Sequence, residues 1–430
     1  MASALALGLG MMLAPEAAQG HGAVPIAQQL MWRGSTMLVQ ASYWGVFVGS
    51  DGGDWRWICE EAMSGVQSRL MSLCTDGTIF ASDRTGLRLS RDSGCSWESV
   101  TSGIDALVIY GLVSELGRAR TWALANNADG SGNGLWSSDD SGRSWQRRYA
   151  MPAHVGSALL GSADDRTLVI SSLASAAPQQ LVLHVSLDGG ATFAAQPLTY
   201  QLDGKAISAA SPLWVDPRVP GRIYLSVPQE SGSVVLRIDG AAAPVEVLRT
   251  PALIYAMERA PAAGSDVVFI GTSKGIYSSQ AGAPFALLST LGSAQCLSAH
   301  GEALYACAWN YFPDFAAIAR LSSDAASFSR VFQFGDTKGP IDCPASTSVG
   351  QICPSYWASY SSQLGGQPTA PSSPAPTSEP GSCQLAPMRH GQAASPSVRP
   401  WGGLLALGLA MLGAGRLRRR RARDSAGPFG

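Results

Sequence analysis

Acidic, basic and phenolic side chains come close together in the second half of the chain. Glu258 and Arg259 follow Tyr255, and Arg218 precedes Arg222 in a neighbouring segment. Arginine can hold a carboxylate through two parallel hydrogen bonds, and paired acidic groups can cleave a glycosidic bond. A glycoside hydrolase with an arginine clamp and a Tyr–Glu nucleophile would use these residue types. Ordinary surface charges explain them equally well, so both interpretations stay open and no catalytic residue is assigned.

The five histidines offer no recognisable nucleophile or acid–base pair. His184 lies within an apolar, strand-like run, where we expect a hydrogen-bonded core histidine. His154 and His300 lie in predicted loops without a visible partner, and His21 and His390 lie near the two ends. The chain has no GxSxG, HExxH or phosphate-binding glycine-rich motif and no CxxC pair. We therefore expect no cofactor and no metal site.

The segment 308–315 carries Trp309, Tyr311 and Phe312 beside polar groups. Aromatic rings of this kind suit stacking on a sugar or anchoring a protein partner. Packing between neighbouring sheets is the alternative, and the sequence favours neither. We predict these three side chains as ligand contacts.

Ser, Asp, Gly and an aromatic residue recur in a fixed order in the first half of the chain. The pattern S-x-D-x-[GS]-x-[ST]-[WF] covers residues 90–97, 138–145 and 186–193, and a partial copy covers residues 50–55. Its Asp recurs at 92, 140 and 188, a period of 48 residues. An Asp that accepts backbone N–H groups and a Gly with positive φ favour a tight turn, and the aromatic ring is expected to be buried between sheets. The period is that of one propeller blade.

These boxes resemble the Asp-box (BNR) repeats of sialidases, sortilin-type propellers and photosystem II assembly factor propellers. The resemblance implies that each box forms the turn between the third and fourth strands of a blade, at the rim away from the ligand face. One carboxylate per box falls short of the six or more oxygens that calcium takes. The resemblance therefore implies roles in the fold, not in catalysis, for Asp51, Ser90, Asp92, Gly94, Trp97, Ser138, Asp140, Gly142, Trp145, Ser186, Asp188, Gly190 and Phe193.

Weaker copies extend the repeat to seven units. The turn positions fall at residues 51, 92, 140, 188, 239, 280 and 324, and short β-branched runs bounded by Gly, Pro, Asp and Ser fill the intervals. We predict an all-β fold, a single propeller of seven four-stranded blades over residues 21–366. Six or eight blades would follow if the weak copies are misassigned.

The two ends are typical of sorting segments. Residues 1–20 are apolar with small residues near Ala18, as in a signal peptide. Residues 367–400 form a Pro/Ser/Thr-rich spacer with Cys383, and residues 401–430 hold a short apolar span followed by six arginines. This order resembles the MYXO-CTERM sorting tail of myxobacterial surface proteins, which implies attachment through Cys383. A plain C-terminal transmembrane anchor is the alternative. We expect export to the outer membrane or cell surface, with the periplasm as the alternative, and membrane contact through the tail.

The predicted propeller is mildly acidic. Residues 21–366 contain 22 Lys and Arg against 28 Asp and Glu, a net charge of −6. Nucleic-acid binding needs a basic patch, so no nucleic acid is expected as a partner. The sequence predicts an interaction module for a surface protein or a glycan. A sialidase-like or other glycoside hydrolase is the alternative, although no arginine motif like the sialidase signature precedes the first box.

Eight cysteines occur in the chain, and export would allow disulfides. Spacing alone does not fix their connectivity, but proximity favours the pairs Cys59–Cys74, Cys296–Cys307 and Cys343–Cys353. Cys95 lies at a variable position of a box, and we expect it to be a free thiol.

Overall fold

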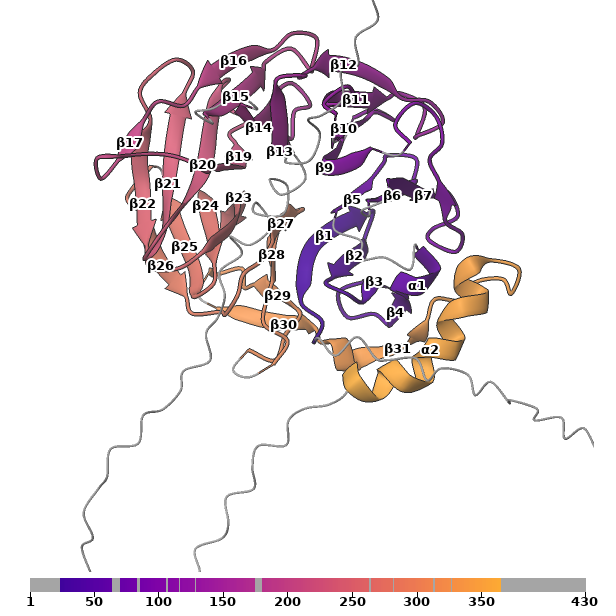
Figure 1. Cartoon of the computed structure of the whole chain (residues 1–430). Helices are drawn as coiled ribbons and strands as arrows, with labels where there is room; N and C mark the ends of the chain where they lie inside the picture. Colours follow the sequence, from indigo (N-terminus) through magenta and orange to yellow (C-terminus); the bar gives the residue numbers. More distant parts are fainter. Residues whose placement is uncertain are drawn as a thin grey trace, which may run out of the picture. The chain divides into compact units, whose positions relative to one another are not determined.

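Seven antiparallel β-sheets follow one another around a ring (Figure 1). The computed structural model describes residues 24–63, 70–82, 86–105, 107–115, 117–127, 129–174, 180–262, 264–280, 282–311, 314–325 and 327–364. The predicted signal peptide, Phe312, Cys383 and the predicted spacer, span and arginine tail lie outside these residues. The prediction of an all-β, seven-bladed propeller is confirmed.

Each blade is built from four consecutive strands. Blade 1 contains β1 (Ala27–Arg33), β2 (Thr36–Ala41), β3 (Gly45–Gly49) and β4 (Trp55–Ile58); blade 2 contains β5 (Leu70–Leu73), β6 (Ile79–Ser82), β7 (Leu87–Ser90) and β8 (Glu98–Ser99). Blade 3 contains β9 (Val108–Ser114), β10 (Thr121–Asn126), β11 (Gly134–Ser138) and β12 (Gln146–Ala150); blade 4 contains β13 (His154–Gly161), β14 (Leu168–Ala174), β15 (Leu181–Ser186) and β16 (Ala194–Pro197). A small hairpin, β17 (Gln201–Leu202) and β18 (Lys205–Ala206), precedes blade 5.

The remaining blades follow the same order. Blade 5 contains β19 (Ser211–Val215), β20 (Arg222–Gln229), β21 (Gly232–Asp239) and β22 (Val245–Thr250); blade 6 contains β23 (Ile254–Ala262), β24 (Ser265–Thr272), β25 (Gly275–Gln280) and β26 (Ala286–Ser289). Blade 7 contains β27 (Leu297–His300), β28 (Ala303–Cys307), β29 (Ile318–Leu321) and β30 (Phe328–Phe332). The first strand of each blade lies next to the first strands of its neighbours around the centre of the ring (Figure 1).

The middle strands are apolar on both faces, because each blade is covered by a neighbour on either side. In β21, Val234, Val235 and Leu236 are all fully buried. The outer strand β12 instead exposes Gln146 and Arg147. The strands therefore read as continuous apolar runs at the middle of a blade and as polar segments at its edge.

Five of the seven predicted turn positions lie between the third and fourth strands of a blade, and the other two, Asp239 and Gln280, are the last residues of third strands. In the third blade, Asp140 Oδ1 accepts hydrogen bonds from Ser138 Oγ at 2.8 Å and from the Ser144 N–H at 2.9 Å. The Gly142 N–H donates to Ser138 Oγ at 2.7 Å. The turns of the blades on either side repeat these three bonds. In these turns the carboxylate holds its own loop closed.

The aromatic residue of each turn packs on the blade before it. Trp145 meets Phe80 edge-on, with ring centroids 6.0 Å apart, and Phe193 stacks on Tyr149 at 4.5 Å. Trp97, in the turn of blade 2, packs against a hydrophobic core cluster that contains residues of blade 1. The turns therefore join successive blades as well as successive strands.

A C-terminal strap, residues 334–364, closes the ring. It consists of the short 3₁₀ turn η1 (Phe334–Asp336), β31 (Thr337–Pro340) and the helix α2 (Ser348–Leu364). β31 pairs in parallel with β4, so the sheet of blade 1 has a fifth strand. α2 packs on the short helix α1 (Glu60–Met63), which follows β4. The strap is thus held by the first blade, beside the last one (Figure 1).

Three disulfides are present among the described residues, and two of them differ from the predicted pairs. Cys296–Cys307 is confirmed. Cys59 pairs with Cys353 and Cys95 pairs with Cys343, so the predictions Cys59–Cys74, Cys343–Cys353 and a free Cys95 are wrong. Both of these bonds attach the strap to blades 1 and 2, an arrangement that sequence proximity cannot reveal. Cys74 is a buried free thiol, and burial raises its pKa.

Candidate functional site

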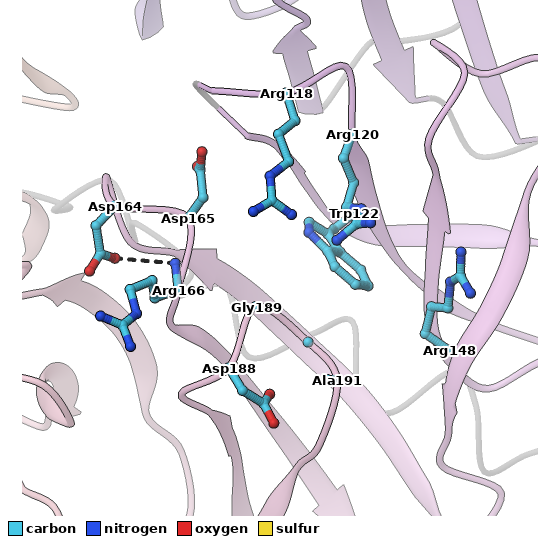
Figure 2. Close-up of a pocket in the computed structure, with 11 residues that line it drawn as sticks. Arg118, Arg120, Trp122, Arg148, Asp164, Asp165, Arg166, Asp188, Gly189 and Ala191 are labelled. Atoms are coloured by element: carbon cyan, nitrogen blue, oxygen red, sulfur yellow. Dashed lines mark hydrogen bonds between the residues drawn. The ribbon is translucent and has the colours of Figure 1, made fainter.

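The turns between third and fourth strands share one end of the ring with the hairpins between first and second strands. We call this end the turn face. Between blades 3 and 4 it is hollowed by a cavity of about 480 Å³, within the size range of small-ligand sites. Its lining includes four arginines and three aspartates (Figure 2): Arg118, Arg120, Arg148, Arg166, Asp164, Asp165 and Asp188. We call it the blade 3–4 cleft.

One wall of this cleft is basic and comes from blade 3. The hairpin between β9 and β10 supplies Arg118 and Arg120, and the outer strand β12 supplies Arg148. The guanidinium groups of Arg120 and Arg148 both bind Asp139, Arg148 at 2.9 Å. Arg148 also donates from Nε to Ser137 Oγ at 2.9 Å. These two arginines are therefore fixed in place by the blade that carries them.

The floor of the cleft is formed by Trp122 on β10. The Arg120 guanidinium lies 5.4 Å from the centre of its ring, a cation–π distance. The indole N–H donates to Glu115 Oε1 at 2.8 Å. Burial raises the pKa of Glu115, while the hydrogen bond from Trp122 and the charge of Arg120 lower it. Because Trp122 is almost fully buried, its ring is a support for Arg120 and no stacking surface for a ligand.

The other wall is mostly acidic and comes from blade 4. Asp164 and Asp165 lie in the hairpin between β13 and β14, and Asp188 lies in the turn after β15. Asp165 Oδ2 accepts the Gly117 N–H of blade 3 at 2.9 Å, and Asp164 Oδ1 accepts the Arg166 N–H at 3.2 Å (Figure 2). The two walls are thus joined directly at the hairpins.

Asp188 is already fully engaged by its own turn. Its two oxygens accept hydrogen bonds from Ser186 Oγ and the Thr192 N–H, and from Thr192 Oγ1 at 2.6 Å. The Thr192 and Ser186 hydrogen bonds lower the pKa of Asp188 to about 2. At neutral pH this carboxylate is ionised, so it is no general acid for glycoside cleavage.

Arg118 differs from the other arginines of the basic wall. Its side chain is 68% exposed, and the carboxylate nearest to it in the described part of the chain, that of Glu115, is 3.9 Å away. Figure 2 shows its guanidinium group directed into the space between the two walls. The basic wall therefore holds one guanidinium group, that of Arg118, that the described part of the protein leaves largely unused.

The predicted ligand contacts lie elsewhere. Trp309 and Tyr311 are half-buried in the loop between β28 and β29 of blade 7, at the end of the ring opposite the turn face. Their rings meet edge-on with centroids 5.6 Å apart. The Asn310 side chain between them accepts the Phe334 N–H of the strap at 2.9 Å. The structure does not bring these aromatics to the blade 3–4 cleft, and their contact role stays a prediction.

The residues considered for hydrolysis are partly engaged in ion pairs. Arg259 binds Asp216 at 2.8 Å and Asp266 at 3.1 Å, and Arg218 binds the same Asp266. Burial raises the pKa of Glu258. Among the described first strands of the blades, only β1 and β23 contain an arginine. A clamp of three arginines around the centre of the ring is therefore not formed by these strands.

His184 is a core residue, as its position in an apolar run indicates. Its side chain is buried, with Nδ1 3.0 Å from the Tyr149 hydroxyl and Nε2 2.8 Å from Ser172 Oγ. Burial and the neighbouring His154 lower the pKa of His184 to about 4. In the described ranges, no group of three or more His, Cys, Asp and Glu side chains is arranged to hold a metal ion.

Sequence reasoning missed the basic wall, although the repeat contained a usable signal. Gly117 and Asp165, which are bonded across the two blades, are one period of 48 residues apart. Arg218 and Asp266, bonded across blades 5 and 6, have the same separation. Residues about one blade length apart can therefore meet across adjacent blades, and hairpin charges could have been paired in this way.

The fold places the chain among the seven-bladed β-propellers. No protein-family model matches it, and no curated protein matches it. Among solved structures it is similar to a GH74 xyloglucanase from Xanthomonas campestris, with a TM-score of 0.48 and 14% identity over 71% of this chain and 53% of that one. A GH74 enzyme of Niastella koreensis gives a TM-score of 0.42 and 13% identity over 66% of this chain and 41% of that one.

A third similar structure is the propeller domain of the Trilobed protease from Pyrococcus furiosus. It gives a TM-score of 0.44 and 9% identity over 73% of this chain and 97% of that one. The chain spans about half the length, or less, of the two GH74 enzymes. At these values the similarities concern the fold, and they carry no argument about activity or ligand.

Proposed function

We propose that this chain is an exported propeller that binds a glycan or a protein at the cell surface and does not transform it. The observation that carries the proposal is the blade 3–4 cleft, which is open, rigid and polar. Its arginines Arg120 and Arg148 are held by Asp139, and its acidic residue Asp188 is engaged by the turn that contains it. Preorganised donors and acceptors favour binding, because little side-chain entropy is lost when a ligand enters.

Export and surface anchoring are parts of the same proposal. Three disulfides are consistent with an extracellular protein. Neither helix among the described residues is long and apolar enough to cross a membrane. We propose that the tail after residue 366 provides the anchor, with Cys383 or the apolar span at residues 401–415 as the attachment. The Asp-box and MYXO-CTERM resemblances support this proposal.

The test uses the full-length chain, immobilised and exposed to a panel of glycans and polypeptides. We expect an intact ligand to be retained by the wild type and lost by Arg148→Gln, which removes a fixed donor of the basic wall. Arg330→Gln is the matched control, because Arg330 is an exposed arginine on the outer strand β30 of blade 7. If the ligand is released as a shorter product, the chain is a hydrolase and the proposal is wrong. If Arg148→Gln leaves retention of the ligand unchanged, the blade 3–4 cleft is not the binding site.

A further inference from the structure

The turn face has a second cleft with arginines and aspartates in its lining. Between blades 5 and 6 it contains a cavity of about 620 Å³, lined among others by Arg218, Arg222, Arg259, Asp216 and Asp266. We call it the blade 5–6 cleft. Both clefts lie between neighbouring blades, and both are lined by arginines and aspartates.

In the blade 5–6 cleft the arginines are bound to aspartates of the protein. Arg218 holds both oxygens of Asp266, one of them at 3.2 Å. Arg259 bridges Asp216 and Asp266, and Arg222 binds Asp239 at 2.6 Å. Each of the three guanidinium groups thus has a carboxylate partner at hydrogen-bond distance. In this cleft, aspartates of the protein therefore occupy the arginines that a ligand could otherwise bind.

Within the part of the chain that the structure describes, Arg118 of the blade 3–4 cleft lacks the aspartate partner that Arg218 has in the blade 5–6 cleft. Arg118 lies in the hairpin between the first and second strands of blade 3, and Arg218 lies in the corresponding hairpin of blade 5; the two are similarly exposed, at 68% and 60%. Arg218 has a two-point aspartate partner, whereas Arg118 has no carboxylate closer than 3.9 Å among the described residues. A planar guanidinium group with free parallel N–H donors is suited to a carboxylate.

The opposite wall adds acceptors. Asp164 Oδ1 accepts hydrogen bonds from the Arg166 N–H and Ser162 Oγ, and Asp165 Oδ2 accepts the Gly117 N–H. A carboxylate has about four acceptor sites, so such a group can accept further hydrogen bonds. Hydroxyl groups are donors that this wall can accept. The cleft therefore suits a compact ligand with one carboxylate on one side and hydroxyl groups on the other.

We propose that the blade 3–4 cleft binds an acidic sugar, a uronic acid unit of a glycan, with its carboxylate on Arg118 and its hydroxyl groups toward Asp164 and Asp165. This inference rests on the proposed binding function and specifies its ligand. A polypeptide would need an apolar anchor pocket, and the one aromatic ring of this cleft, Trp122, is buried. An extended polyanion would need a long basic track, whereas the predicted propeller has a net charge of −6.

Calorimetric titration of the full-length chain with trigalacturonate tests the proposal. The trisaccharide carries the carboxylates, and its methyl ester carries the same rings without charge. We expect wild type to bind the acid, and Arg118→Gln and the methyl ester each to weaken binding by about 10- to 100-fold, because a charged hydrogen bond is lost. Arg218→Gln is the matched control in the blade 5–6 cleft, and it should leave the affinity within about twofold.

Three results would overturn the inference. They are equal binding of acid and ester, an equal effect of the two arginine variants, and no binding of trigalacturonate while another ligand is retained. In the last case the binding function stands and the ligand class is wrong. If poly-glutamate binds as tightly as trigalacturonate, and Arg118→Gln weakens it equally, the cleft recognises carboxylates on polypeptides instead. Cleavage of the trisaccharide would overturn both the inference and the proposed function.

Discussion

At the scale of single residues, the hydrogen-bond and ion-pair partners of a side chain within the protein determine whether it can bind a ligand. Arg118 and Arg218 have similar exposure and lie in corresponding hairpins of two blades, yet of the two only Arg218 has a two-point aspartate partner among the described residues. Asp188 and Asp140 are carboxylates whose oxygens are used to close turns. The residue type predicts the available chemistry, and the neighbours determine how much of it remains for a ligand.

His184 gives a prediction about pH. Its folded-state pKa is lowered to about 4 from 6.5 by burial and by His154. The unfolded chain therefore takes up a proton first as the pH falls, so the stability that neutral His184 provides is complete above pH 6.5 and is lost between pH 6.5 and about 4. The full shift corresponds to about 3 kcal/mol.

Urea unfolding of wild type and His184→Asn at several pH values measures this effect. We expect the wild type to be the more stable protein at pH 7 to 8, with a constant difference there. The difference should shrink by up to about 3 kcal/mol toward pH 4, because only the wild type has this group to protonate. A difference that stays constant down to pH 4 would show that His184 is not held neutral by its surroundings.

At the scale of elements, the turn between third and fourth strands is fixed by packing as well as by hydrogen bonds. Gly142 has φ +85°, and a Cβ there would lie 2.6 Å from the Phe80 ring of blade 2. Gly240, in the corresponding turn of blade 5, has φ +57° and open space around a Cβ. A comparison of alanine substitutions at these two glycines therefore distinguishes the cost of backbone strain from the cost of crowding between blades.

We expect Gly240→Ala to cost about 1 to 2 kcal/mol of unfolding free energy, from the left-handed backbone alone. Gly142→Ala should cost about 1 to 3 kcal/mol more, because the new methyl group overpacks the contact between blades 2 and 3. Equilibrium denaturation in urea measures both variants. Equal costs would mean that the turn does not hold the blades together through Gly142.

These turns also show how much of the structure can be predicted from the sequence. Their Ser–Asp–Gly hydrogen bonds lie within five residues, so a local pattern is enough to place them, and their period predicts the blades. The blade 3–4 cleft depends on Arg118, Arg148 and Asp165, which come from two hairpins and one outer strand in two blades. No local pattern joins them, because their proximity arises only when the ring forms.

The aromatic loop illustrates the opposite error. Trp309 and Tyr311 form a cluster of aromatic residues in the sequence, but both are half-buried in the structure. Asn310, between them, is hydrogen-bonded to the strap. Composition indicates that such side chains make large contacts without telling whether a ligand or the protein provides them. The two unpredicted disulfides have the same cause, since the ends that they join, 294 and 248 residues apart, meet only in the closed ring.

At the scale of the whole molecule, closure of the ring distinguishes the propeller from an open row of blades. Each blade is formed by consecutive strands, so no strand is shared between the first blade and the last. The seam is held by side chains, including Trp55 stacked on Phe332 at 3.9 Å and Arg320 bound to Asp51 at 3.1 Å. It is also spanned by the strap, whose β31 pairs with β4 and whose two cysteines bind blades 1 and 2.

The two strap disulfides close nearly the same large loop, so their contributions should be coupled. Either one alone restricts the unfolded chain by joining its distant ends, and the second then closes only a short additional loop. In the chain-entropy model, the first bond contributes about 5 to 6 kcal/mol and the second about 4. We therefore expect the double variant Cys59→Ala/Cys353→Ala, and equally Cys95→Ala/Cys343→Ala, to be about 4 kcal/mol less stable than the wild type.

Removing both strap disulfides should cost about 9 to 10 kcal/mol, more than the sum of the two single removals, because the last bond to be lost is the one that holds the large loop. Removing Cys296–Cys307, which spans 11 residues within blade 7, should cost about 3 kcal/mol and add independently to either of the others. Urea unfolding of the double, quadruple and blade 7 variants measures these costs. Strict additivity of the two strap bonds would mean that they do not act together as the closure of the ring.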